Sequence, residues 1–459
     1  MRAGVDSLER WIVAGLLILL IWLPLPLGSN RDWAVGVFVT WVGLLGLAWA
    51  VLKIRAGGNQ RPSSAWSHGL LLAGLLFATQ AWVAVQWLAG ITVDVGSTFQ
   101  RLMLGLSYSL LFVMVIALFQ TRSRLTLLLA TLVVSGTFQA FHGAFTSLSG
   151  IEWLLFSPKT TYIGDATGTF INRNHLAGYL ELTIACGLGL LLALRDGRPI
   201  SWRNSLELLL GPKARLRLAL VIMVIALVMT HSRGGNIGFF VGLMVVGTLF
   251  VLRNRQHRVR NIAVLLSIVL IDVLVISQYF GLERLKDRLV QTRLTDAVVD
   301  GRVVATANEL RDDVLLQAVP LLKERPWTGQ GAGSFEAVFP RFPDHTIPLH
   351  FDHAHNDYLQ FGVEFGVLGS LPLALFAALA LWHALKALWR RESAYCSGVG
   401  FGAAMGIIAL AVHSGTDFNL QIPANAATFV VLCAIAVLAG HHLKPQRRQH
   451  GTPMSKFKT

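Results

Sequence analysis

The stretch ANAATFVVLCAIAVLAGH, residues 424–441, contains no Asp, Glu, Lys or Arg and is close to the length that a helix needs to cross a bilayer. Similar runs recur along the whole chain, at 11–27, 34–52, 69–90, 102–119, 125–147, 175–194, 216–231, 235–252, 262–280, 357–388 and 397–414. They are continuous and not alternating, which favours helices over barrel strands. The pattern predicts an all-α polytopic membrane protein with about twelve transmembrane helices.

The composition agrees with a membrane protein. Hydrophobic residues make up 54% of the chain, charged residues only 14%, and the mean hydropathy is +0.58, whereas soluble domains carry about 25% charged residues. The net charge of +14 could indicate nucleic-acid binding, but most basic residues lie in short loops between apolar runs. Membrane orientation explains them better, so no nucleic-acid partner is predicted. Cys186, Cys396 and Cys433 lie in or beside the runs and have no pair or metal spacing.

The longest connection between runs, 281–356, is too polar to cross lipid and divides the chain. Residues 1–280 would hold helices one to nine, 281–356 a loop subdomain of short helices, 357–441 helices ten to twelve, and 442–459 a basic tail. If the N-terminus is cytoplasmic, basic residues concentrate in the loops of the cytoplasmic side. The positive-inside rule therefore predicts cytoplasmic N- and C-termini and a loop subdomain on the outer face.

Four polar clusters then fall on the outer face. They are TGTFINRNH at 167–175, THSRGG at 230–235, the loop 281–356 with its HAHNDY end, and HSGTDFNLQIPAN at 413–425. Scattered helix caps would not sort to one side of the membrane in this way. The sequence therefore predicts a functional site at the outer face.

Two residues have the strongest claims to that site. His355 lies where a helix begins, a position that favours anions, and an imidazole titrates near neutrality and can accept a proton. Capping of the helix is the alternative for His355. Arg233 lies near the edge of the hydrocarbon layer, where ionisable groups often mark a site, and snorkelling to the headgroups is its alternative.

The remaining polar candidates each have an equally ordinary structural interpretation. Arg311 is followed by Asp312 and Asp313, which also fits a surface salt-bridge network. Helix capping and a structural turn are the alternatives for the other candidates, which are Asn172, Arg173, Asn174, His175, Asp417 and Asn419. The chain lacks GxxxxGK[ST], HExxH and GxSxG, and it has no Asp-x-Asp pair on the outer face. We therefore predict neither a metal nor a cofactor.

The segment His355-Asn356, followed by Gly366-Val367-Leu368-Gly369, resembles the signature of the O-antigen ligase and Wzy-type polysaccharide polymerase superfamily. Arg311 precedes Pro326 and the segment WTGQGAGSF, as in the family's loop pattern. FINRNHLAGYL, HSRGG and DFNLQIPANA also resemble its members. These motifs follow one another in the order that the family has, and they cover the chain from 165 to 430.

The resemblance implies a GT-C-like membrane fold with a large periplasmic loop subdomain between helices nine and ten. It also implies an inverting, metal-independent glycosyltransferase of the bacterial inner membrane, active at the periplasmic face on an undecaprenyl-diphosphate-linked glycan. By this resemblance His355 is the catalytic histidine, and Arg233 and Arg311 hold the donor diphosphate. The expected substrate-binding residues are Asn356, Asn172, Arg173, Asn174, His175, Asp417 and Asn419.

The acceptor stays open at this point. It is either a growing glycan, as for a polymerase, or the lipid A core, as for a ligase, and the motifs do not separate the two. The extended FINRNHLAGYLEL and DFNLQIPANA segments resemble exopolysaccharide and capsule members more, which favours a polymerase. Membrane lipids and other polysaccharide assembly proteins are expected partners. The alternative functions are a polytopic transporter and a non-catalytic component of a polysaccharide export complex.

Overall fold

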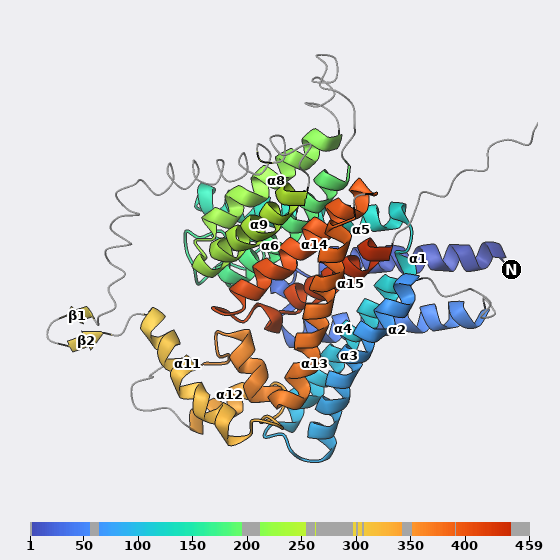
Figure 1. Cartoon of the computed structure of the whole chain (residues 1–459). Coiled ribbons are helices and arrows are strands. Elements are labelled where there is room, and N and C mark those ends of the chain that lie inside the picture. Colours follow the sequence, from blue (N-terminus) through green and yellow to red (C-terminus); the bar gives the residue numbers. More distant parts are fainter. Residues whose placement is uncertain are drawn as a thin grey trace, which may run out of the picture.

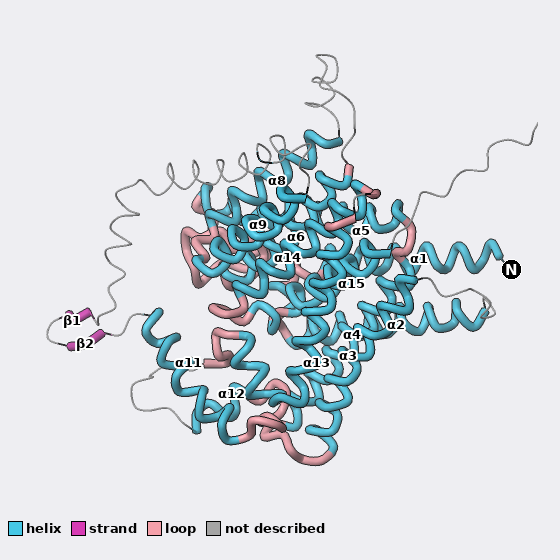
Figure 2. The backbone as a smooth tube through the Cα atoms, in the orientation of Figure 1, coloured by secondary structure: helices cyan, strands magenta, loops and turns pink. Residues whose placement is uncertain are grey.

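The computed structural model describes residues 2–55, 64–194, 212–253, 262, 297–299, 302–304, 307–341, 351–390 and 392–441. Almost all of this part of the chain is helical (Figure 2). Loops connect the helices, and a short antiparallel pair is also present, β1 (Ala297–Val299) and β2 (Arg302–Val304). Nine of the helices described are long and apolar enough to cross a membrane, which confirms the prediction of a helical, multi-pass membrane protein.

The nine helices are α2 (Asp32–Arg55), α3 (Ser64–Leu88), α4 (Val95–Leu118), α5 (Arg122–Ser149), α6 (Arg173–Ala193), α9 (Arg233–Arg253), α13 (Asp357–Leu388), α14 (Ala394–His413) and α15 (Pro423–His441). The predicted runs 11–27 and 216–231 lie in or overlap α1 (Arg2–Trp22) and α8 (Pro212–Met229), which are not among the nine. The run 262–280 lies outside the described residues except for 262, and the tail 442–459 lies wholly outside them.

The first predicted helix, 11–27, ends earlier than expected. α1 stops at Trp22 because Pro24 and Pro26 follow, and a proline disfavours helical backbone in the residue before it. The chain then turns through a short 3-10 segment, Leu27–Ser29, in which Gly28 has a φ of +71°. A Cβ at Gly28 would lie 2.6 Å from the Phe170 ring, so this turn is held against the segment before α6.

The centre of the bundle is built from α6, α14 and α15, whose side chains are nearly all buried (Figure 1). α6 and α14 approach closely through small residues, since a Cβ at Gly402 would lie 2.4 Å from the Ala185 carbonyl oxygen. α14 also packs against α9, where a Cβ at Gly238 would lie 2.6 Å from the Ala409 carbonyl oxygen. This close packing fixes the end of α14 relative to its neighbours.

Part of the connection between α9 and α13 forms two helices beside the bundle, α11 (Ala307–Glu324) and α12 (Phe335–Val338) (Figure 1). A separate hydrophobic cluster holds them in place. Val314, Ala318 and Leu321 of α11 pack with the α12 region and with Ala354 and Val363. α11 therefore lies against the turn that carries His355.

The predicted run 357–388 is one element in sequence but is broken inside. Gly366 has φ +61° and ψ −172°, a backbone region essentially confined to glycine. The loop after Pro326 hydrogen-bonds to the groups that the break frees. The backbone N–H of Gln330 donates to the Val363 carbonyl at 2.8 Å, and the backbone N–H of Val367 donates to the Pro326 carbonyl at 2.9 Å. The break and the loop thus form one unit.

Replacing Gly366 with alanine is expected to destabilise this unit. The backbone strain costs about 1–3 kcal/mol, and the new Cβ would lie 2.4 Å from the Trp327 carbonyl oxygen. Thermal unfolding of the detergent-purified protein should show a clearly lower Tm. Gly74→Ala, in α3 with nothing within 4 Å of its Cβ, is the matched control. Equal Tm values for the two variants would refute this account of the break.

Candidate functional site

Four helices begin at the same end of the bundle. Asn172 caps α6 by accepting a hydrogen bond from the Asn174 amide at 2.9 Å, and Asn356 caps α13 by accepting one from the Leu359 amide at 3.0 Å. α9 begins at Arg233 and α15 at Pro423. The positive ends of four helix dipoles point toward this end, and such ends favour bound anions.

Contacts between the four polar clusters show that they meet. The side-chain amide of Asn425, in α15, donates to the His175 backbone carbonyl of α6 at 3.0 Å. The backbone N–H of Asp357, in α13, donates to the Ser414 backbone carbonyl at 2.9 Å. A Cβ at Gly234 would lie 2.3 Å from the Thr416 hydroxyl oxygen, so α9 begins against the same turn. The segments 167–175, 230–235, 351–356 and 413–425 therefore surround one place.

His355 lies at the centre of this place. Its backbone is left-handed, with φ +51°, and its Nδ1 lies 3.7 Å from Oδ1 of Asp417. That distance is too long for a hydrogen bond, and the contact becomes an ion pair only when the imidazole takes up a proton. Asp417 is 1% exposed and accepts a hydrogen bond from the Phe418 amide at 2.8 Å. A buried carboxylate next to an imidazole can orient it and stabilise its protonated form.

Asp417 carries a negative charge because its neighbours favour the ionised carboxylate. Burial by itself would raise the pKa of this carboxyl, but the neighbouring His355, His175 and His413 hold it below its usual range. Asp417 therefore stays ionised at neutral pH. Asp417 is buried, so its substrate-binding role stays a prediction, and the neighbouring group through which it could act is the His355 imidazole.

Phe418 packs against three imidazole rings at once. The ring centroids of His353, His175 and His355 lie 4.4, 4.7 and 4.9 Å from that of Phe418. Burial, followed by the nearby charge of Arg101, keeps the pKa of His353 well below its usual value. His353 is thus neutral, and its Nδ1 lies 3.0 Å from Nε2 of Gln360. All three imidazoles therefore pack around Phe418, with His175 buried and the His355 side chain 14% exposed.

The two predicted arginines are placed differently. Arg233 is the first residue of α9, is exposed, and has no hydrogen bond or ion pair to another described residue. Its helix start contacts the turn that leads to Asp417. Arg311 lies in α11, one turn before Val314, but its side chain lies outside the described part of the structure. The backbone places α11 beside the His355 turn.

Several predicted substrate-binding side chains have structural partners. Asn356 donates to the Gly415 carbonyl at 2.9 Å in addition to capping α13, and Asn172 caps α6. Asn419 accepts from Asn425 at 2.9 Å and lies where a Cβ at Gly178 would be 2.2 Å from its Oδ1. Asn174 and His175 are buried. Their role in substrate binding stays a prediction.

Arg173 takes part in a second cluster of charged groups. It forms an ion pair with Asp165 at 2.7 Å and lies over the Tyr162 ring. His231 contacts the same carboxylate. Burial would raise the pKa of Asp165, but His231 and Arg173 more than offset it and leave the pKa lowered. Sequence reasoning had not paired Asp165 with the site.

Sequence reasoning also missed buried polar residues that stabilise the site from inside. Gln86 of α3 donates to the Thr328 and Glu364 carbonyls at 2.6 and 2.9 Å, which holds the loop to the break in α13. Gln360 accepts from the Ala354 amide at 3.1 Å and so fixes the turn before His355. Glu181 and His413 form a buried pair at 2.9 Å. The sequence signal that could have found these residues is a single polar residue within an otherwise apolar run.

Residues 218–374 match the family model described as Wzy_C, O-Antigen ligase. This match supports the resemblance to the O-antigen ligase and Wzy superfamily over residues 218–374. The matched segment starts in α8 and ends in α13, and it contains Arg233, Arg311, His355 and the Gly366 break. Asp417 lies beyond it. No curated protein matches the chain. The match suggests a glycosyltransferase-like enzyme that uses polysaccharide and lipid-linked substrates.

Proposed function

We propose that the protein is an inverting, metal-independent glycosyltransferase that moves a glycan from an undecaprenyl-diphosphate donor to an acceptor glycan at the periplasmic face of the bacterial inner membrane. The observation that carries the proposal is the position of His355 beside the buried carboxylate of Asp417, where four helices begin. The helix starts favour binding of an anionic donor, and His355 can act as the base for the acceptor hydroxyl. The positive-inside distribution of basic residues supports the periplasmic orientation.

The reaction follows from these groups. The acceptor hydroxyl attacks the anomeric carbon of the donor sugar while His355 takes the hydroxyl proton. The new carbon–oxygen bond forms as the bond from the anomeric carbon to the phosphate oxygen breaks. The lipid diphosphate leaves with that electron pair, and the single displacement inverts the anomeric centre. Asp417 stabilises the imidazolium that forms.

The leaving group requires charge neutralisation more than protonation. Arg233 and Arg311 would grip phosphate oxygens through their planar guanidinium groups and stabilise the growing charge. The dipoles of the helix starts add to this field. In this proposal two arginines supply the positive charge that a divalent metal would otherwise supply, and this is why the activity is proposed to be metal-independent.

Glycan transfer by the purified protein tests the proposal. In detergent, with a glycan on a lipid diphosphate as donor and EDTA present, we expect transfer at the rate seen without EDTA. An absolute requirement for added Mg²⁺ or Mn²⁺ would contradict the arginine clamp. Absence of transfer under every metal condition, with a confirmed donor and acceptor, would contradict the enzymatic function itself.

Surface glycans of a deletion strain would separate the two acceptors. A polymerase predicts loss of long chains with single repeats retained. A ligase predicts lipid-linked long chains and an unmodified lipid A core. The resemblance of the extended segments to exopolysaccharide members favours the first outcome.

A further inference from the structure

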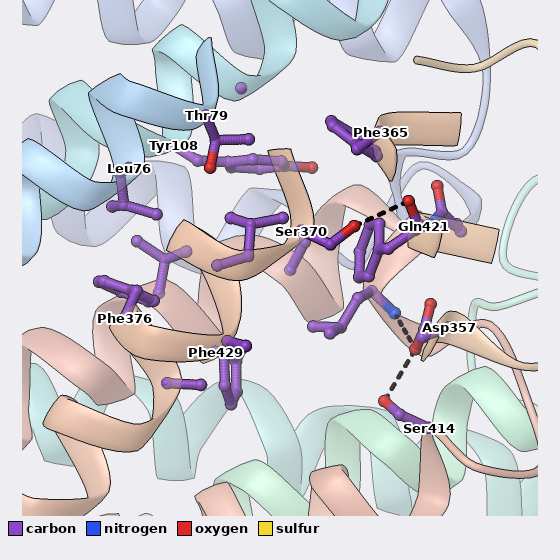
Figure 3. Close-up of a pocket in the computed structure, with 18 of the residues that line it drawn as sticks. Leu76, Thr79, Tyr108, Asp357, Phe365, Ser370, Phe376, Ser414, Gln421 and Phe429 are labelled. Carbon is purple, nitrogen blue, oxygen red and sulfur yellow. Dashed lines mark hydrogen bonds between the residues drawn. The ribbon is translucent and has the colours of Figure 1, made fainter. Parts of the chain in front are cut away.

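A cavity of about 280 Å³ lies next to the His355 turn, between α3, α4, α13, α14 and α15 (Figure 3). Its walls are mainly apolar, with Leu76, Phe376 and Phe429 at one end. Asp357 and Ser414 lie at the other end, and Asp357 comes two residues after His355. The volume is just below the range of small-molecule sites, so the cavity suits one narrow chain.

The cavity and Arg233 lie on different faces of α14. Met405, Ala409 and His413, spaced four residues apart, face the glycines of α9. Leu410, Ala411 and Ser414 line the cavity instead. Successive residues of a helix are rotated by about 100°, so these two sets point in clearly different directions. The end of α14 therefore separates two spaces, and the segment 413–417 that follows it reaches Asp417.

Arg101 of α4 lines the cavity and carries a positive charge. No hydrogen bond or ion pair joins it to another described residue. Its charge acts on His353 and Glu364, which places it near the His355 turn. Both oxygens of Glu364 already accept hydrogen bonds, from the Gly333 amide at 2.9 Å and from Gln360 at 3.0 Å. Glu364 therefore has hydrogen-bond partners of its own, and Arg101 lines the cavity without a hydrogen bond to it.

A second polar group lines the same wall. Tyr108 lies seven residues after Arg101, on the same face of α4, and its hydroxyl is buried without a hydrogen-bond partner among the described residues. A buried hydroxyl without a partner costs free energy that a ligand could recover. Apolar walls, with a cation and a hydroxyl that have no hydrogen-bond partner in the described part of the chain, together fit a lipid chain that carries a phosphate group.

We propose that this cavity holds the lipid anchor of the second substrate, a single-chain prenyl phosphate or diphosphate that carries the acceptor glycan, with its phosphate at Arg101. The inference rests on the proposed function, in which Arg233 and Arg311 take the donor diphosphate. Donor and acceptor would then enter on opposite sides of α14 and meet at His355. A narrow cavity selects a single-chain lipid over the several acyl chains of lipid A, which is the arrangement that a polymerase requires.

Binding of radiolabelled farnesyl diphosphate to the full-length protein in detergent tests the site. We expect one molecule to bind at the start of α9 and a second in the cavity. Ala377→Trp, which fills the cavity, should remove the second binding event. Ala378→Trp, on the exposed side of the same helix, is the matched control and should retain both. Equal binding by the two tryptophan variants would overturn the proposal.

Arg101→Gln keeps the test valid if Ala377→Trp does not fold. Its affinity for farnesyl diphosphate in the cavity should fall about tenfold, with farnesol binding unchanged. An unchanged preference for the diphosphate over farnesol would overturn the role of Arg101. The proposed function is checked separately, because glycan transfer that is equal in Ala377→Trp and Ala378→Trp would refute the acceptor site alone. If Ala377→Trp loses cavity binding but the wild-type protein transfers no glycan, the cavity site stands and the proposed function alone is refuted.

Discussion

Replacing His355 with asparagine is expected to lower glycan transfer about 10²–10⁴-fold, the contribution of a positioned general base. Asparagine is the sharper choice than alanine because His355 has φ +51°, a left-handed conformation that asparagine tolerates well. The variant should therefore fold normally while the proton acceptor is lost. The initial rate of transfer from a lipid-diphosphate donor in detergent is the measurement.

His68→Asn serves as the control for this experiment. His68 is an exposed histidine of α3 that stacks on His441, at the opposite end of the bundle from His355. Its variant should transfer glycan at the wild-type rate. The two proteins should elute alike in size-exclusion chromatography and unfold at similar temperatures. Transfer by His355→Asn within a few-fold of wild type would remove the base role from His355.

Arg233→Lys is expected to lower transfer about 10²-fold, because one donor to a developing charge contributes roughly 10²–10³. Lysine keeps the charge but lacks the flat pair of N–H groups that grips two phosphate oxygens. Arg233→Gln should lose more, since the charge is lost as well. Neither change should lower the Tm, because Arg233 is exposed and has no described partner to lose.

Arg31→Lys is the matched control, since Arg31 is also exposed and its loop lies at the same end of the bundle, beside Phe170 and Ile422. If Arg31→Lys and Arg233→Lys have similar rates, then Arg233 extends to the lipid headgroups and is not part of a donor site. A rate that falls only for Arg233 identifies the start of α9 as the place of the diphosphate.

The helical membrane fold could be predicted because a charge-free run such as 424–441 leaves few alternatives in a bilayer. The sequence also predicted that 413–425 and 351–356 lie at the same face of the membrane, because counting the apolar runs places both segments on the outer side. The Gly366 break was not, because an apolar run has the same composition whether or not its backbone is continuous. Arg101 directly precedes the apolar run 102–119, a position that does not distinguish it from other basic residues at helix ends. Only packing shows that it faces a cavity.

The partners of the His355 turn could not be predicted either. Gln86 and Gln360 lie far apart in sequence, and a single glutamine in an apolar run does not indicate its contact. Gln86 contacts residues near 330 and 364, which no local pattern connects. The proximity of Asp165 to His231 depends on how two loops fold over each other. Such contacts follow from tertiary packing and not from spacing.

The pairing of residues 326–331 with the broken segment of α13 has a consequence for protein engineering. The two stretches share backbone hydrogen bonds and a brace from α3, so neither is a portable module. A chimera that borrows the loop of a relative would also have to borrow the helix turn around 363–368 and the residue at position 86. Exchanging specificity among these proteins is therefore a matter of transplanting three sequence-distant pieces together.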